Sequence, residues 1–301
     1  MNLSNLKQLF YYFPLRWLAT LLPISLIGVL GTLCAYIEIL TIRPGTKKRL
    51  FVNLMTALGL ENDSQKCATL CFNVIRHYIW NILEFTLAHR LWKGRKTNFI
   101  QLVGFEHITQ SLRQGRGVVL VGGHLATFEF HTTAVAWQGY SSAQVEPRET
   151  QLDNIPSGIP RIIQIYRRRH QTRYLQYETI YTGMGFRQAL KFLKQGRVVG
   201  IAIDYPVVTH SVICRFLGQE RKVPLGPAYL AMKTDADIVI AHLERITFGK
   251  NRLTFIPVPV IKTEDFIADI SSLSLQLAQT YEQFILKHPE QWAWQMWLQN
   301  Q

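Results

Sequence analysis

The chain has 301 residues, a formal net charge of +13 at pH 7, and 48% hydrophobic residues. That length and apolar content allow a large buried core and exclude a globally disordered protein. The excess of cations favours anionic partners such as membranes, acidic carrier proteins or phosphorylated substrates, but no zinc-finger, RRM-like or helix-turn-helix pattern indicates nucleic acid.

The four cysteines form no CxxC pair. Cys67 and Cys71 are one helical turn apart, while Cys34 and Cys214 stand alone. This pattern is typical of small buried thiols in a reducing compartment and does not indicate zinc. We therefore expect neither a metal nor another cofactor.

A long apolar stretch, WLATLLPISLIGVLGTLCAYIEIL, covers residues 17–40 and carries one charge, Glu38. Its length suits a membrane span of roughly 20 residues. Aromatic residues stand at its start and cations follow its end, as at membrane interfaces: Tyr11, Tyr12, Trp17, Arg43, Lys47, Lys48 and Arg49.

Four interpretations of this stretch stay open. A single span would leave the basic C-terminal part in the cytoplasm, and a monotopic hairpin would bend at Pro23. A buried core helix is the third, and a cleavable signal peptide is the least favoured, because no convincing small-x-small site follows. We predict a membrane-associated segment over residues 1–48 and one α/β domain over residues 49–301.

Residues 47–91 have a helical pattern with a break at Asn62 and Asp63, after which Ser64 is the expected N-cap. Helices and short apolar strands then alternate. The expected helices are 106–114, 127–137, 186–194, 225–233 and 265–286; the expected strands are 99–103, 118–121, 198–203, 238–243 and 253–257, the last antiparallel at the edge.

Two of these units have the same order: a helix, a QGR turn, an apolar strand and a polar residue. They cover residues 106–124 and 186–204. Continuous runs of Val, Ile and Leu indicate strands buried on both faces. We therefore predict an α/β fold with a mainly parallel central sheet flanked by helices, preceded by a helical hydrophobic N-terminal membrane segment.

Ligands of open α/β sheets bind beyond the carboxyl ends of the strands, and His124 and Asp204 each follow such an end. In GVVLVGGHLATFEF, residues 117–130, Gly123 keeps the backbone close to a substrate. Glu129 reaches His124 only if the histidine lies in a bent loop before the helix. A carboxylate on one imidazole nitrogen would then let the other take a proton from a hydroxyl; a structural histidine is the alternative.

HLATFE resembles the His-x4-Asp/Glu motif of the glycerolipid acyltransferase superfamily. Three further features resemble its bacterial lipid A late acyltransferases, the lauroyl and myristoyl transferases. These are Asp204 after QGRVVG, FLG at 216–218 with VPLGPAYLAMKTDADIV soon after it, and HPEQWAW at 288–294. The resemblance covers nearly the whole chain.

The resemblance implies transfer of a fatty acyl group from an acyl carrier protein or coenzyme A thioester to a lipid hydroxyl at the bacterial inner membrane, with the catalytic domain facing the cytoplasm. His124 would be the general base and Glu129 its partner. Arg148 in EPRET, and next Arg187 in GFRQAL, would grip a phosphate or the donor, while Asp204 shapes the acceptor site. A solvated surface cation is the alternative for each arginine.

Two departures from the family leave the acceptor open between a lipid A precursor, a related glycolipid and a lysophospholipid. DYP at 204–206 lacks a second acidic residue, and no basic tail follows HPEQ. A catalytically silent membrane adaptor is the alternative function.

The tryptophans of HPEQWAW are expected to pack in the core or to lie at the membrane interface. The arginines of residues 161–173 are expected to be solvated or to bind anionic headgroups or the carrier protein.

Overall fold

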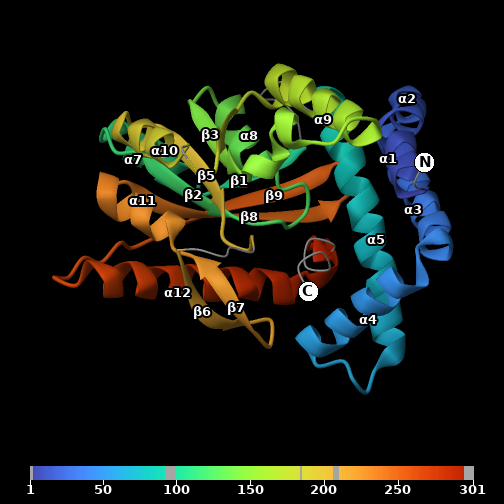
Figure 1. Ribbon diagram of the computed structural model, residues 1–301. Coiled ribbons are helices and arrows are strands. Elements are labelled where there is room, and N and C mark those ends of the chain that lie inside the picture. Colours follow the sequence, from blue (N-terminus) through green and yellow to red (C-terminus); the bar gives the residue numbers. More distant parts are fainter. Residues whose placement is uncertain (1–2, 92–98, 184, 206–209, 295–301) are drawn as a thin grey trace.

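The computed structural model describes residues 3–91, 99–183, 185–205 and 210–294, and it confirms the α/β fold with a mainly parallel sheet flanked by helices (Figure 1). Seven strands follow the order β1-β9-β8-β2-β5-β3-β4. Five of them are parallel, whereas β1 and β9 run in the opposite direction. Their bounds are β1 Ile100–Val103, β2 Val118–Gly122, β3 Ser142–Glu146, β4 Glu178–Tyr181, β5 Val198–Ala202, β8 Asp237–Thr247 and β9 Lys250–Val258.

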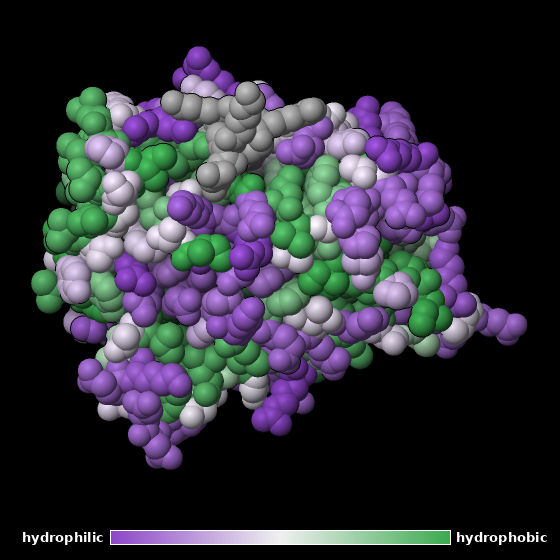
Figure 2. Space-filling view, turned by 180° about the vertical axis from the view of Figure 1, so that it is seen from behind, coloured by the Kyte–Doolittle hydropathy of each residue, from purple (hydrophilic) through white to green (hydrophobic). Residues whose placement is uncertain are grey.

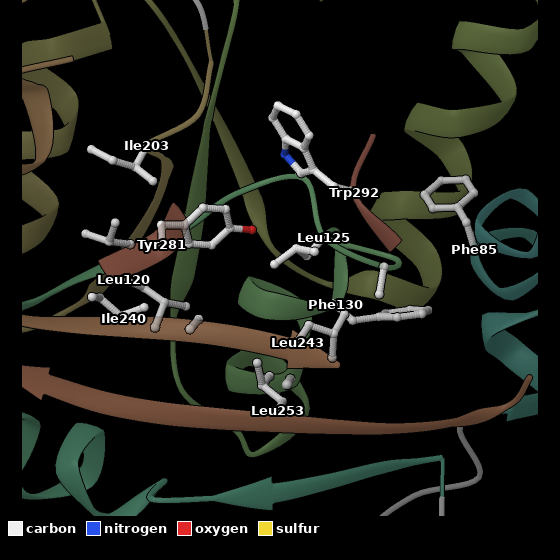
Figure 3. Close-up of a cluster of buried hydrophobic side chains, with 14 of the residues drawn as sticks. Phe85, Leu120, Leu125, Phe130, Ile203, Ile240, Leu243, Leu253, Tyr281 and Trp292 are labelled. Carbon is white, nitrogen blue, oxygen red and sulfur yellow. The ribbon is translucent and has the colours of Figure 1, made fainter. Parts of the chain in front are cut away.

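The centre of the sheet explains the apolar runs of the sequence. β2 lies between β5 and β8 and is buried along its whole length, so both of its faces need apolar side chains. Figure 3 shows the core cluster around β2, β8 and β9, with Leu120, Ile240 and Leu253 labelled. Because β2 and β5 are parallel and in register from Val118 to Gly122, their carboxyl ends meet at one edge.

Helices cover both faces of this sheet. Successive strand residues point to opposite faces: a Cβ on Gly122 would meet His131 of α8, whereas a Cβ on Gly123 would meet Tyr281 of α12. α8 and α12 therefore cover opposite faces at the end of β2. The helices after β1 are α7 Glu106–Arg113, α8 Phe130–Trp137, α9 Ile159–His170, α10 Gly185–Lys194, α11 Gly226–Thr234 and α12 Phe266–Lys287.

The N-terminal helices stand beside the sheet and pack on one long helix, α5 (Figure 1). The apolar stretch 17–40 is divided at Pro23. Among the helices in the described part of the chain, only α3 is long and apolar enough to cross a membrane. One face of α3 packs closely on α5, since Trp80 Nε1 donates to Gly28 O at 3.1 Å. The bounds are α1 Leu3–Tyr12, α2 Pro14–Leu21, α3 Ile24–Thr41, α4 Pro44–Leu58, α5 Ser64–Thr86 and α6 Ala88–Leu91.

Several predicted details are wrong. α5 is capped by Asp63, not Ser64, because the Asp63 carboxylate accepts from Lys66 N at 2.9 Å. α8 begins at Phe130 rather than Thr127, which leaves residues 123–129 as a loop. β9 pairs antiparallel with β8 as expected, but it does not form the edge, since β1 pairs with its other side.

The sequence did not predict a two-stranded hairpin that lies outside the main sheet. It consists of β6 (Ser211–Phe216) and β7 (Gln219–Pro224), paired antiparallel. Leu217 and Gly218 form its turn, both with positive φ, as a two-residue type I′ hairpin requires. Glu282 of α12 accepts a hydrogen bond from Leu217 N, which ties the turn to the helical layer.

Candidate active site

The adjacent ends of β2 and β5 bring His124 and Asp204 together although they are 80 residues apart in sequence. Asp204 Oδ1 lies 2.7 Å from His124 Nδ1, and Asp204 Oδ2 accepts from the backbone N of His124 at 2.8 Å. Both carboxylate oxygens therefore bind the same residue, which fixes the imidazole ring relative to its own backbone.

The electrostatics of this pair determine which nitrogen carries the proton. Burial opposes ionisation of Asp204, yet His124 and the indole of Trp292 together hold the pKa of its carboxyl below the ordinary value. Burial likewise disfavours the imidazolium, but the charge of Asp204, aided by Glu129, raises the pKa of His124. Because an ionised carboxylate only accepts, Nδ1 carries a proton, and Nε2 is the nitrogen left to act as a base.

Glu129 is not the carboxylate that binds His124 Nδ1, contrary to the expected pairing. Because α8 begins at Phe130, Glu129 takes the N-cap position, and its Oε1 accepts from Arg167 Nη2 of α9 at 2.9 Å. The hydrogen-bonded partner of His124 is Asp204, which was expected to shape the acceptor site. Glu129 still lines the same cavity and adds negative potential there.

A cavity of about 320 Å³ opens at these strand ends. Gly123, His124 and Glu129 line it from the loop after β2. Further lining residues come from the ends of β3 and β5 and from α9, and several carry charge or a hydroxyl: Glu146, Thr150, Arg167, Arg168, Tyr177, Thr182 and Tyr205. The cavity therefore combines an imidazole base with two carboxylates and two guanidinium groups.

Two of the four arginines of α9, Arg167 and Arg168, line the cavity and bind groups of the protein. Arg167 Nη1 donates to Tyr12 Oη at 2.6 Å, in addition to its bond with Glu129. Arg168 binds both carboxylate oxygens of Glu146, at 3.0 and 2.5 Å. Of the two interpretations of these arginines, the solvated face is thus wrong for Arg167 and Arg168, whereas Arg169 is exposed. The N-terminal helix α1 also contributes to the site through Tyr12.

The structure leaves Arg148 and Arg187 outside the cavity, and Asp204 lies buried against His124 rather than among the lining residues. Both arginine side chains are exposed. Arg148 begins a 3-10 turn at the rim, where its backbone N donates to Thr182 Oγ1 at 3.1 Å. Arg187 lies on α10, and neither arginine belongs to the described residues that line the cavity.

The C-terminal motif HPEQWAW contacts both Asp204 and the backbone of His124. Trp292 Nε1 donates to Asp204 Oδ2 at 2.7 Å, and Ala293 N donates to His124 O at 3.0 Å. Trp292 and Trp294 are both buried. The packing interpretation of these two tryptophans is therefore the observed one, and a place at the membrane interface is excluded for them.

A buried polar network holds the far end of the loop, and the sequence did not predict it. Arg245 of β8 donates to both carboxylate oxygens of Glu84 in α5, at 3.1 and 2.8 Å, and to Thr127 Oγ1 at 2.8 Å. His77 Nδ1 and Asn81 Oδ1 also accept from Arg245, at 2.8 and 2.5 Å. Such a buried ion pair is tolerated because its groups are hydrogen-bonded.

Within the described ranges, no group of three or more His, Cys, Asp or Glu side chains is arranged to hold a metal ion. The site offers instead an oriented imidazole at the edge of a cavity, and the neutral form of this imidazole leaves Nε2 unprotonated. This arrangement can remove a proton from a hydroxyl group during its attack on a carbonyl carbon.

Two comparisons with known proteins gave different results. A search of curated protein sequences found no match. A family model, described as bacterial lipid A biosynthesis acyltransferase, matches residues 3–301 and so includes the N-terminal helices, the His124 loop and the C-terminal motif. By this match the chain belongs to the bacterial lipid A biosynthesis acyltransferase family.

Proposed function

We propose that the protein moves a fatty acyl group from an acyl carrier protein or coenzyme A thioester to a hydroxyl of a lipid A precursor or related glycolipid, with His124 as the general base. Membership of the acyltransferase family supports the reaction class. The observation that carries the role of His124 is that this residue lines the cavity and its Nδ1 lies 2.7 Å from Asp204 Oδ1.

In this mechanism His124 Nε2 takes the proton of the acceptor hydroxyl while the oxygen attacks the thioester carbonyl carbon. The carbonyl oxygen becomes an oxyanion in the tetrahedral intermediate. When the C–O double bond re-forms, the C–S bond breaks, and His124 returns its proton to the leaving thiolate. Asp204 keeps Nδ1 protonated throughout and stabilises the transient imidazolium.

The paired arginines give Glu129 a role that differs from direct contact with His124. Arg167, held by Glu129 at 2.9 Å, and Arg168, held by Glu146, put cationic groups beside the cavity. Fixed cations stabilise charge that develops on an oxyanion or a phosphate. Glu129 therefore contributes by orienting Arg167.

Arg148 keeps a proposed role in donor binding, because it stands at the rim beside Pro147 and Thr150, which line the cavity. An exposed guanidinium there suits the phosphate of a pantetheine arm. Arg187 is exposed on α10 and is not among the described lining residues, so it suits a docking contact with an acidic carrier.

We propose that the N-terminal helices bind the inner membrane from its cytoplasmic face. Large apolar side chains are exposed along α2 and α3. Because α3 packs on α5, a spanning α3 would carry part of the α/β domain into the bilayer, so the packing supports the monotopic interpretation. The exposed residues are Trp17, Leu18, Leu21, Ile24, Leu26, Val29, Leu33, Tyr36, Ile37 and Leu40.

The decisive experiment is an acyl-transfer assay with purified membranes that contain the protein or its His124→Ala variant. Acyl carrier protein and coenzyme A thioesters are offered as donors, with a lipid A precursor and a lysophospholipid as acceptors. We expect product on the lipid A precursor, lowered about 10²- to 10⁴-fold by His124→Ala because a general base contributes that factor. His107→Ala, on α7 outside the cavity lining, is the matched control and keeps the parental rate.

Parental rates in the His124→Ala variant would refute the general-base role. A preference for lysophospholipid would replace the proposed acceptor. Absence of product from the parent protein with either acceptor would favour the catalytically silent adaptor instead.

A further inference from the structure

The carboxylate of Asp204 is held by three N–H groups. Two belong to His124 itself, the backbone N at 2.8 Å and the ring Nδ1 at 2.7 Å. The third is the indole of Trp292, 88 residues further along the chain, which donates to Oδ2 at 2.7 Å. One side chain of the C-terminal motif therefore holds the carboxylate that orients His124.

An indole is chemically suited to this position. Its N–H is a neutral donor with no acceptor function, so it stabilises the ionised carboxylate without adding a charge that would compete with His124. A lysine or arginine in its place would cancel much of the field that favours the imidazolium. The ring of Trp292 is only 2% exposed and so also keeps water from Asp204.

The backbone around Trp292 fixes the indole relative to the His124 loop. Residues 291–293 run antiparallel to residues 124–126, with a bridge between Leu125 and Trp292, which lie close together in Figure 3. Ala293 N donates to His124 O at 3.0 Å, and Ala126 N donates to Gln291 O at 2.9 Å.

Gln291 connects this segment to the sheet. Its side chain accepts from Arg245 N at 2.8 Å and donates to Arg245 O at 3.0 Å, and Arg245 belongs to β8. The segment is thus attached on one side to a central strand and on the other to the loop that carries the base. Small displacements of Trp292 are restricted in both directions.

We infer that Trp292 is a positioning residue of the acyl-transfer site, whose indole N–H holds the Asp204 carboxylate in line with His124. The inference rests on the proposed function, since it assigns Trp292 to the base of that reaction. It gives the C-terminal motif a part in catalysis beyond packing, although Trp292 touches neither donor nor acceptor.

Two tryptophans of the same motif allow a matched test. Trp292→Phe removes the N–H bound to Asp204, whereas Trp294→Phe removes an N–H that donates to the backbone O of Pro289 at 2.6 Å. Both rings are buried, so the loss of packing is alike. We expect Trp292→Phe to lower kcat about tenfold with KM within twofold, and Trp294→Phe to leave kcat within twofold.

A second readout is the pKa of His124, measured without turnover from the pH dependence of its carbethoxylation by diethyl pyrocarbonate and assigned by peptide mass. The groups that face His124 are Asp204, Glu129 with its partner Arg167, Tyr205, whose ring centroid is 6.3 Å from that of His124, and His131, whose pKa burial lowers to about 3. Without the indole N–H, the negative charge of Asp204 is less compensated by hydrogen bonds and so stabilises the imidazolium more strongly. The pKa of His124 is therefore expected to rise in Trp292→Phe and to stay unchanged in Trp294→Phe.

Replacement of Trp292 by the isostere 3-benzothienylalanine, in which sulfur stands in place of N–H, covers the case that Trp292→Phe folds poorly. We expect the same fall in kcat and rise in pKa. Parental kcat and pKa in this isosteric variant would overturn the inference, as would equal losses in Trp292→Phe and Trp294→Phe with an unshifted pKa. Failure of the proposed reaction itself would appear separately, as a parent protein without transfer whose His124 pKa still depends on Trp292.

Discussion

The base strength of His124 depends chiefly on one buried neighbour, Asp204. The Asp204 side chain is fully buried, so its charge acts on the imidazole with little screening by water. General-base catalysis needs neutral His124, and activity therefore increases as the pH rises through the pKa of this residue. Since Asp204 raises that pKa, it sets the pH at which the acid limb of the rate profile lies.

Asp204→Asn is expected to move the acid limb of the kcat profile to lower pH, because the charge that favours the imidazolium is removed. The plateau rate should nevertheless fall about 10²- to 10⁴-fold, since an amide no longer fixes the proton on Nδ1. Measuring kcat between pH 5 and pH 9 separates the two effects. An acid limb at the parental pH would contradict the role given to Asp204.

For individual residues, the sequence predicted where the site lies better than which side chains bind one another in it. His124 and Asp204 follow apolar strands, and parallel strands place such residues at one edge, so both were identified. Which carboxylate binds the imidazole depends on where α8 begins, and a shift of that helix start to Phe130 directs Glu129 toward Arg167. Helix boundaries are the least reliable part of a sequence-based prediction.

Among the elements, the loop after β2 depends on glycine because α12 lies directly beneath it. A Cβ on Gly123 would lie 2.6 Å from Tyr281 Oη, and Tyr281 is fully buried. The buried ring has no free space into which it can move. The second glycine of the Gly-Gly pair is thus required by packing between a strand end and a helix.

We expect Gly123→Ala to destabilise the protein by about 1–3 kcal/mol, the usual cost of overpacking a core, and to lower acyl transfer because the loop carries His124. The measurement is urea unfolding followed by circular dichroism. Gly45→Ala is the control, since a Cβ there meets no atom within 4 Å. A Gly123→Ala variant as stable as Gly45→Ala would refute the packing argument.

Three of the strands that the sequence did not predict, β4, β6 and β7, share partial exposure. β6 and β7 carry charged residues such as Arg215, Glu220 and Arg221 between their apolar positions, because the hairpin pairs outside the main sheet. β4 is an edge strand and is only partly buried. Continuous apolar runs identify central strands such as β2. Partly exposed strands are held in pairs by backbone hydrogen bonds, which leave no clear pattern in the residue types.

Across the whole molecule, apolar exposure is unevenly distributed. Figure 2 shows hydrophobic side chains gathered at the edge formed by the N-terminal helices. Exposed cations follow α3 at Arg43, Lys47, Lys48 and Arg49. An apolar surface bordered by cations suits an anionic bilayer, where both burial and charge contribute to binding.

Two isoleucines with the same exposed fraction test this surface. Ile37 on α3 and Ile213 on β6 are both 62% exposed. Ile37→Glu is expected to weaken binding to phosphatidylglycerol vesicles at least about tenfold, because it loses apolar burial and brings a negative charge to an anionic bilayer. Ile213→Glu changes charge and hydropathy equally but lies off the proposed surface, so its binding should stay within twofold of the parent.

Vesicle flotation measures the binding of both variants. Equal weakening by the two substitutions would mean that net charge alone governs binding, whereas parental binding by Ile37→Glu would remove α3 from the membrane contact.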